Sequence, residues 1–194
     1  RTGTYDKNRE FYVTSSPSMD ILISSNLERL LYILSGGKDD EVRGYMKLLS
    51  ENGKYTVSDK ILSLIKESFY GGFADEEECA AAIRGTYEKY GYVTDTHTSV
   101  AVSVHEKYVQ ETGDNKKTLI ASTASPFKFS GDVLCALGDG NVELDEFRML
   151  EYLADNYDLR IPKSLADLEE KEVRFETVCN KNQMKAVISE FLSK

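Results

Sequence analysis

The run Thr118-Leu119-Ile120-Ala121-Ser122-Thr123 is the stretch that decides the fold class. It is short and mostly apolar, and the turn residues Gly113-Asp114-Asn115 precede it. These features are typical of a strand that is buried on both faces within a parallel sheet. Together with the helices expected on both sides of it, the run predicts an α/β fold with few strands and flanking helices.

Helices are predicted immediately before and after this run. On its N-terminal side, Asp95-Thr96-His97-Thr98 can cap a helix that extends to about residue 112. The elements expected on its C-terminal side are two helices, a strand and a terminal helix, near residues 131–137, 144–156, 173–178 and 180–191.

The N-terminal half is predicted to be mostly helical, apart from a short strand at residues 11–15. Apolar residues then recur at helical spacing in three segments, and glycines end these helices at Gly36-Gly37, Gly53 and Gly71-Gly72. Asp75 followed by Glu78 is the pattern of a capping box, which predicts the start of a fourth helix.

The length and composition fit a folded core with a small appended subdomain. The chain has 194 residues, of which 41% are hydrophobic. We expect residues 38–92 to form a helical insertion subdomain. Residues 1–37 and 93–194 are expected to belong together to one larger domain.

The charge of the chain excludes some partners. A formal net charge of −9 makes nucleic acids and anionic membrane surfaces poor partners for the chain as a whole. An anionic substrate remains possible, because local donors are enough to bind one. No apolar run approaches the ~20 residues that span a bilayer, and no signal-peptide pattern precedes the first strand, so a cytoplasmic protein is expected. Because the first residue is Arg1, a piece of a longer polypeptide is also expected.

Patterns that bind metals are weak in this sequence. Three cysteines stand at wide spacings and there are two histidines, so neither a disulfide framework nor a zinc site is predicted. The run from Asp139 to Phe147 resembles half of a calcium loop. However, Leu144 and Leu150 fall where that loop requires glycine and a bidentate glutamate. An acidic turn that caps a helix is the better interpretation.

Three further residues invite a catalytic interpretation. Lys128 lies between two phenylalanines and could be a desolvated imine-forming lysine, but a structural lysine is favoured. His97 and His105 lack a nucleophile or carboxylate at a known catalytic spacing, so capping or core roles are favoured. Spacing alone therefore assigns no chemistry.

Three motifs resemble those of the threonine synthase family. They are Ser16-Pro17-Ser18-Met19-Asp20-Ile21 with the following Ser24 to Leu31 run, Asp95-Thr96-His97-Thr98-Ser99-Val100-Ala101, and Ser122-Thr123-Ala124-Ser125-Pro126-Phe127-Lys128-Phe129. Their order and spacing match the family, with Ser99 where alanine is usual. The resemblance covers essentially the whole chain and corresponds to the C-terminal portion of the family.

The resemblance implies a pyridoxal-phosphate lyase of the tryptophan-synthase-β-like fold. The implied reaction converts O-phospho-L-homoserine and water to L-threonine and phosphate. In the family, the Schiff-base lysine and the glycine-rich phosphate loop lie N-terminal to the region resembled here. No catalytic residue is therefore expected within this chain, and the chain by itself is expected to be inactive.

The resemblance also implies site residues. Thr123 is the expected cofactor residue, because in this fold a Ser or Thr hydroxyl faces the pyridine nitrogen. A threonine that simply ends a buried strand is the alternative. The residues that the family places near the cleft, as candidates for substrate or phosphate binding, are Ser24, Ser25, Asn26, Arg29, Asp95 and His97. Ordinary helix capping is the alternative for Ser25 and Asn26.

Two alternatives to threonine synthase remain open at this point. One is another pyridoxal-phosphate lyase of the same fold that acts on a different amino acid. The other is a non-catalytic threonine-synthase-like protein that binds a partner or ligand. A parent chain that lacks the lysine and the glycine-rich loop would favour the second alternative.

Overall fold

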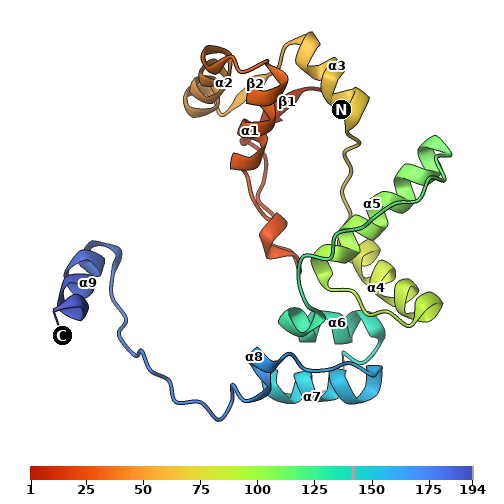
Figure 1. The fold of residues 1–194 in the computed structure, drawn as a ribbon, viewed down its shortest axis with the longest axis vertical. Coiled ribbons are helices and arrows are strands. Elements are labelled where there is room, and N and C mark those ends of the chain that lie inside the picture. The colour runs from red at the N-terminus through yellow and green to blue at the C-terminus, as the bar shows by residue number, and fades with distance from the viewer. Residues whose placement is uncertain (141–142, 194) are drawn as a thin grey trace. The chain divides into compact units, whose positions relative to one another are not determined.

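The computed structural model describes residues 1–140 and 143–193 of the chain (Figure 1). Its contacts define two compact units, Arg1–Leu159 and Arg160–Lys194. The first unit contains two clusters of packed elements, one built around a small sheet and one built only from helices. Both clusters are needed to understand where the site residues lie.

In the first cluster, three helices pack on a two-stranded sheet. Strands β1 (Thr4–Asp6) and β2 (Lys54–Thr56) are antiparallel, and Tyr5 pairs with Tyr55. The helices are α1 (Ser25–Leu34), α2 (Asp39–Asn52) and α3 (Asp59–Ser68). The buried core is apolar apart from two tyrosine hydroxyls and consists of Leu31, Val42, Tyr45, Leu49, Tyr55, Val57 and Ile61. The rings of Tyr5, Tyr55 and Tyr45 stack in series, with centroids 5.6 and 5.2 Å apart.

Gly53 ends α2 in a left-handed conformation, with φ of 73°. Its backbone oxygen accepts a hydrogen bond from the Lys7 N–H at 2.8 Å, and the Asn8 side chain donates to the Asn52 oxygen at 3.0 Å. A Cβ atom at Gly53 would lie only 2.6 Å from Asn8 Cγ. The left-handed turn therefore favours glycine, and a side chain at this position would also displace the Asn8 amide.

The second cluster consists of four helices, in which the first packs against the second and the third, and the third packs against the fourth. They are α4 (Glu76–Tyr90), α5 (Thr96–Thr112), α6 (Ser130–Leu137) and α7 (Glu146–Tyr157). Their buried side chains include Ile83, Val133 and Leu153. The predicted capping box is confirmed, because Asp75 and Glu78 each accept the other's backbone N–H at 2.9 Å.

Two short turns join these elements near the candidate site. The 3-10 turn η1 (Pro17–Met19) lies between β1 and α1, and η2 (Pro126–Phe129) leads into α6. At the first residue, the Arg1 guanidinium donates to Tyr70 Oη at 3.0 Å and to Glu111 at 3.2 Å. These bonds connect the start of the chain to the C-terminal end of α5.

The unit Arg160–Lys194 contains the short helix α8 (Lys163–Ala166), the 3-10 turn η3 (Lys181–Gln183) and α9 (Met184–Leu192). Asn180 and Gln183 form a capping box before the terminal helix, which was expected near residues 180–191. The Phe175 and Phe191 rings make an edge contact at 6.0 Å.

Three predicted strands are wrong for the described chain. Residues 11–15, 118–123 and 173–178 are irregular and mostly exposed, and Leu119 is 96% exposed. A parallel strand needs neighbouring strands to satisfy its backbone N–H and C=O groups. Within residues 1–140 and 143–193, the only paired strands are β1 and β2, which are too short to be recognised by periodicity.

The acidic turn before α7 agrees with the capping interpretation. Asp145 accepts the Arg148 backbone N–H at 3.0 Å and so caps the helix. Residues 141 and 142 of the calcium-loop-like run lie outside the described residues. Across the described ranges there is no cluster of three or more side chains suited to a metal ion, and no helix with the length and apolarity of a membrane span.

The division into residues 38–92 and the remainder stays a prediction. The limits at Gly36-Gly37 and Tyr92 do lie in loops. The packing, however, follows other boundaries: α2, β2 and α3 pack with α1 and β1, whereas α4 packs with α5 and α6.

Candidate functional site

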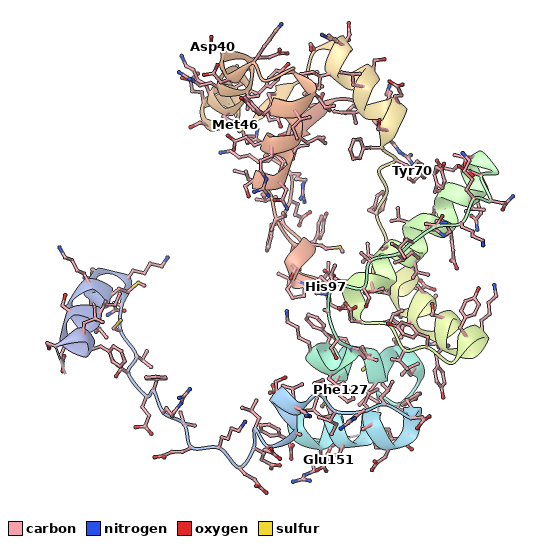
Figure 2. All side chains as sticks on the ribbon, viewed as in Figure 1. Asp40, Met46, Tyr70, His97, Phe127 and Glu151 are labelled. Carbon is pink, nitrogen blue, oxygen red and sulfur yellow. The ribbon has the colours of Figure 1, made fainter. Side chains whose placement is uncertain are left out.

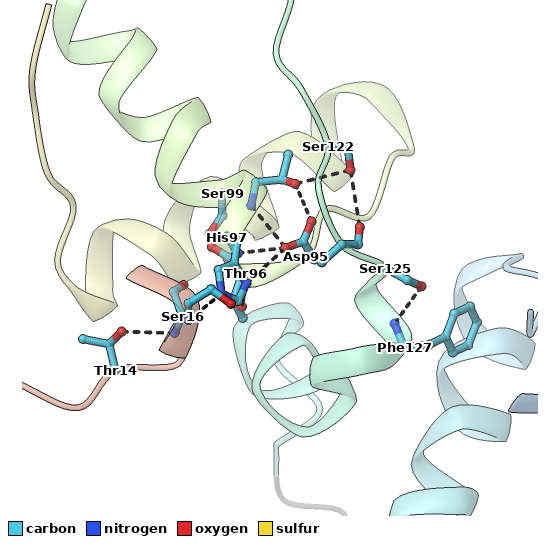
Figure 3. Close-up of polar contacts among 12 residues, drawn as sticks. Thr14, Ser16, Asp95, Thr96, His97, Ser99, Ser122, Ser125 and Phe127 are labelled. Atoms are coloured by element: carbon cyan, nitrogen blue, oxygen red, sulfur yellow. Dashed lines mark hydrogen bonds and ion pairs between the residues drawn. The ribbon is translucent and has the colours of Figure 1, made fainter. Parts of the chain in front are cut away.

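A buried polar cluster forms where α5 begins, and Asp95 is its centre (Figure 3). Asp95 is fully buried, and its Oδ1 accepts the backbone N–H groups of His97 at 2.9 Å and Thr98 at 3.2 Å. Its Oδ2 accepts the Thr98 hydroxyl. Both carboxylate oxygens are thus hydrogen-bonded, which compensates for removing the charge from water.

His97 connects this cluster to the turn η1. The residue lies at the start of α5 (Figure 2). Its Nε2 lies 3.1 Å from the backbone N–H of Ser18, which can only donate. Nε2 must therefore be the unprotonated nitrogen, and the ring proton is on Nδ1. Nδ1 lies 3.5 Å from Asp95 Oδ1 and 3.3 Å from Thr96 Oγ1, so both can accept from it. The ring is buried and packs on Phe129, with centroids 4.8 Å apart.

The cluster extends to the segment that contains Thr123. The hydroxyls of Thr98 and Ser122 lie 3.3 Å apart, and the Ser125 hydroxyl accepts the Phe127 N–H to cap η2 (Figure 3). Thr123 follows Ser122 and is exposed. Among residues 1–140 and 143–193, no group forms a hydrogen bond with its hydroxyl, so that hydroxyl is available to a ligand.

The other candidate residues lie at the start of α1. Ser24 is the N-cap residue, but its side chain makes no capping bond, so the first-turn N–H groups keep their donor capacity. The Ser24 backbone N–H itself donates to Tyr5 Oη at 2.6 Å. Ser25, Asn26 and Arg29 are exposed, and the Arg29 guanidinium donates to the Asn26 side-chain oxygen.

A cavity of about 320 Å³ lies beside η1. Ser16 and Met19 line it, together with Arg9, Thr14 and Asp20. The wall is held in shape because Asp20 accepts both the Thr14 N–H and the Thr14 hydroxyl at 2.7 Å. Arg9 donates to the Ile21 backbone oxygen at 2.8 Å.

Cys79 also lines this cavity and is buried. Burial raises the pKa of its thiol above the ordinary value, although a bond with Ser99 opposes the shift. A protonated thiol is a poor nucleophile, so a covalent role for Cys79 is not supported. Lys128 is exposed, and its ammonium group lies over the Phe129 ring at 5.2 Å, which agrees with a structural lysine.

The structure brings some of the predicted residues together. Asp95 and His97 belong to one cluster, which reaches Thr123 through Thr98 and Ser122. Ser24, Ser25, Asn26 and Arg29 form a second group at the start of α1. The bond between His97 and Ser18 ties the first cluster to the chain six residues before Ser24.

Sequence reasoning assigned no site role to three participants, namely Tyr5, Thr98 and Ser122, although Thr98 and Ser122 lie within the quoted motifs. Thr98 carried a usable signal, because it stands at the third position after an N-cap aspartate. Tyr5 and Ser122 reach their partners through contacts between residues 19 and 24 positions apart, which no local pattern reveals.

Comparison with known proteins identifies the family. A family model described as "Threonine synthase, C-terminal" matches residues 98–188. The crystal structure of threonine synthase from yeast superposes with a TM-score of 0.80 at 28% identity, covering 99% of this chain and 39% of that one. The chain belongs to the threonine synthase family. The expected α/β class, as the later part of a threonine synthase fold, is thereby confirmed.

Other threonine synthases and related proteins agree. The structure of PLP-bound threonine synthase from Brucella melitensis has a TM-score of 0.72 at 34% identity, covering 98% of this chain and 36% of that one. Threonine synthase from Saccharomyces cerevisiae is 31% identical over 209 residues, which cover 100% of this chain. Threonine synthase-like 1 from Mus musculus is 34% identical over 170 residues, which cover 87% of this chain. This chain spans 39% of the yeast protein's length and 22% of the mouse protein's.

Proposed function

We propose that this chain forms the C-terminal part of an enzyme that converts O-phospho-L-homoserine and water to L-threonine and phosphate. The similarity to threonine synthases along essentially the whole chain is the observation that supports this most strongly. Because the chain spans only 38–39% of the length of two fungal threonine synthases, the activity is proposed for the complete protein.

Pyridoxal phosphate is the proposed cofactor, since a neighbour in structure is a PLP-bound threonine synthase. When bound, it supplies an electron sink for chemistry at the substrate's carbon atoms. Thr123 is the residue of this chain that we assign to it. An exposed hydroxyl without a partner among the described residues can donate to an unprotonated pyridine nitrogen, but it cannot stabilise a pyridinium as a carboxylate would.

The proposed substrate phosphate site is the start of α1. Free first-turn N–H groups and the positive end of the helix dipole favour an anion there. Arg29 adds a fork of donors that suits phosphate oxygens, and Ser24, Ser25 and Asn26 add short polar side chains. Asp95 and His97 are proposed as structural neighbours of the cleft.

A second candidate is a threonine-synthase-like protein that binds a ligand without catalysis, and relatives named threonine synthase-like 1 fit it weakly. The two candidates differ in the part of the protein that precedes this chain. A complete protein with the cofactor lysine and the phosphate loop supports the enzyme, and one that lacks both supports the binding protein.

The test is release of phosphate and formation of threonine from O-phospho-L-homoserine by the complete protein, with Thr123 variants. Thr123→Val keeps the shape and removes the donor, so the concentration of pyridoxal phosphate for half-saturation should rise on the order of tenfold. Thr123→Ser keeps the hydroxyl and should stay close to the parent protein. If no threonine forms at any cofactor concentration, the proposed enzymatic activity is ruled out. If both variants bind the cofactor equally well, the proposed contact of Thr123 with the cofactor is ruled out.

A further inference from the structure

The contact between His97 and Ser18 joins residues that are 79 positions apart. Ser18 lies in η1, whose Ser16 and Met19 line the 320 Å³ cavity, and the chain then continues to the proposed phosphate site at Ser24. The side chain of Ser18 is exposed, so the turn is held at this point by its backbone rather than by its side chain.

The bond requires one protonation state of the imidazole. The Ser18 N–H needs a lone pair on Nε2, which exists only when the ring is neutral with its proton on Nδ1. Asp95 and Thr96 provide acceptors on the Nδ1 side, and packing on Phe129 limits rotation of the ring. Asp95 is itself fixed by two backbone N–H groups, so the arrangement begins at the N-cap of α5.

We infer that His97 is a positioning residue, which holds the η1 turn against the start of α5 by accepting the Ser18 N–H. This inference rests on the proposed function, because it gives His97 a task in shaping the substrate side of that site. His97 does not exchange a proton with substrate in this role. Its ring nitrogen Nε2 is already used by the backbone, and the ring is only 5% exposed.

Two substitutions separate this role from others. His97→Phe keeps an aromatic ring against Phe129 and removes the acceptor. His97→Gln replaces Nε2 with an amide oxygen that can accept the same N–H, but an amide cannot titrate. If His97 is a positioning residue, His97→Gln should keep activity that His97→Phe loses. If His97 is an acid–base catalyst, activity should be lost in both variants. His105→Phe, which changes the other histidine of α5, is the matched control.

The first measurement is amide hydrogen exchange at Ser18 in the complete protein. We expect a protected amide in the parent protein, and exchange faster by a few-fold to about tenfold in His97→Phe. His97→Gln and His105→Phe should retain protection. An unprotected Ser18 amide in the parent protein would overturn the inference, and so would equal protection in His97→Phe. Neither outcome depends on the protein having catalytic activity.

The second measurement is the kcat/KM for phosphate release. It should fall in His97→Phe and recover at least in part in His97→Gln, and loss in both variants would overturn the positioning role. If the parent protein makes no threonine, the proposed function fails. The exchange experiment still decides the role of His97, so the two failures can be told apart.

Discussion

At the scale of single residues, Asp95 shows how capping and site geometry can depend on one carboxylate. It receives two backbone N–H groups and a hydroxyl while fully buried. Asp145 makes the same kind of cap for α7 with one backbone N–H at the surface. The two helices therefore offer a matched comparison of a buried and an exposed N-cap.

We predict that Asp145→Ala lowers the free energy of unfolding by about 1 kcal/mol, the usual value of an exposed cap. Asp95→Ala should cost more, on the order of 2–3 kcal/mol, because it leaves buried donors of His97 and Thr98 without an acceptor. Urea unfolding of both variants measures the difference. Equal losses would show that burial adds nothing to this cap.

Arg29 provides a second prediction at this scale. If its guanidinium binds the substrate phosphate, Arg29→Lys should raise the KM for O-phospho-L-homoserine on the order of tenfold, because lysine cannot make a bidentate contact. Arg43→Lys is the control, since Arg43 pairs with Asp39 at 2.8 Å on the neighbouring helix. Steady-state kinetics that show the same KM in both variants would place the phosphate elsewhere.

At the scale of elements, the tyrosine stack against the small sheet is sensitive to alkaline pH. Burial, with further contributions from Tyr5, Glu28 and Tyr45, raises the pKa of Tyr55 to about 12 from the ordinary 10.0. The folded chain thus keeps the Tyr55 proton at a pH where the unfolded chain has lost it. The stability linked to this group is complete below pH 10 and is lost as pH rises toward 12.

We predict that Tyr55→Phe makes the stability less dependent on pH between about 10 and 12, because the ring remains and the ionisable group is gone. Thermal unfolding across this range measures the effect, with the exposed Tyr92→Phe as control. Some dependence should remain through Tyr157, whose pKa is raised by burial and by its bond to Asp139. An unchanged slope in Tyr55→Phe would contradict the prediction.

The elements that the sequence predicted well are those specified locally. Helices such as α1 and α2 have apolar stripes, and caps such as Asp75, Asp95 and Gly53 lie within a few residues of the backbone they serve. The predicted strands at residues 118–123 and 173–178 failed because strand pairing depends on distant partners, which a local apolar run does not specify.

The same distinction applies to the candidate site. The cap at Asp95 was predictable from the sequence, whereas the contact of His97 with Ser18 was not, because it depends on how η1 packs against α5. The motifs did identify residues that the fold places close together, such as Ser122 and Thr98. They did not indicate that Ser18 takes part in the site through its backbone N–H, which donates to His97.

At the scale of the whole molecule, the two compact units differ in how much backbone is protected. Residues 171–180 have no regular secondary structure and are exposed, and they contain Lys171 and Arg174. The basic residues of α4 and α5, by contrast, lie in hydrogen-bonded helices. Proteases need several residues of accessible, extended backbone, so the two regions should respond differently.

We predict that limited trypsin digestion of this chain cuts first in its exposed irregular segments, after Lys171 or Arg174 and after Lys116 or Lys117, and leaves α4 and α5 intact. Mass spectrometry of the first products identifies the cut. Lys171→Gln and Arg174→Gln together should remove the cuts at residues 171–174 and leave the cuts at residues 116–117 in place. A first cut within α4 or α5 would show that these helices open more readily than their hydrogen-bonded backbone indicates.

The close approach of Asn8 to Gly53 has a consequence for the order in which this sequence can change. A side chain at position 53 would displace the Asn8 amide, so a lineage that replaces Gly53 first loses the bond to Asn52 in the same step in which it takes on the left-handed backbone strain. A lineage that first shortens Asn8 loses one surface hydrogen bond and then faces only the cost of the left-handed backbone. The two substitutions are therefore historically ordered, and descendants should more often carry a changed Asn8 with Gly53 intact than the reverse.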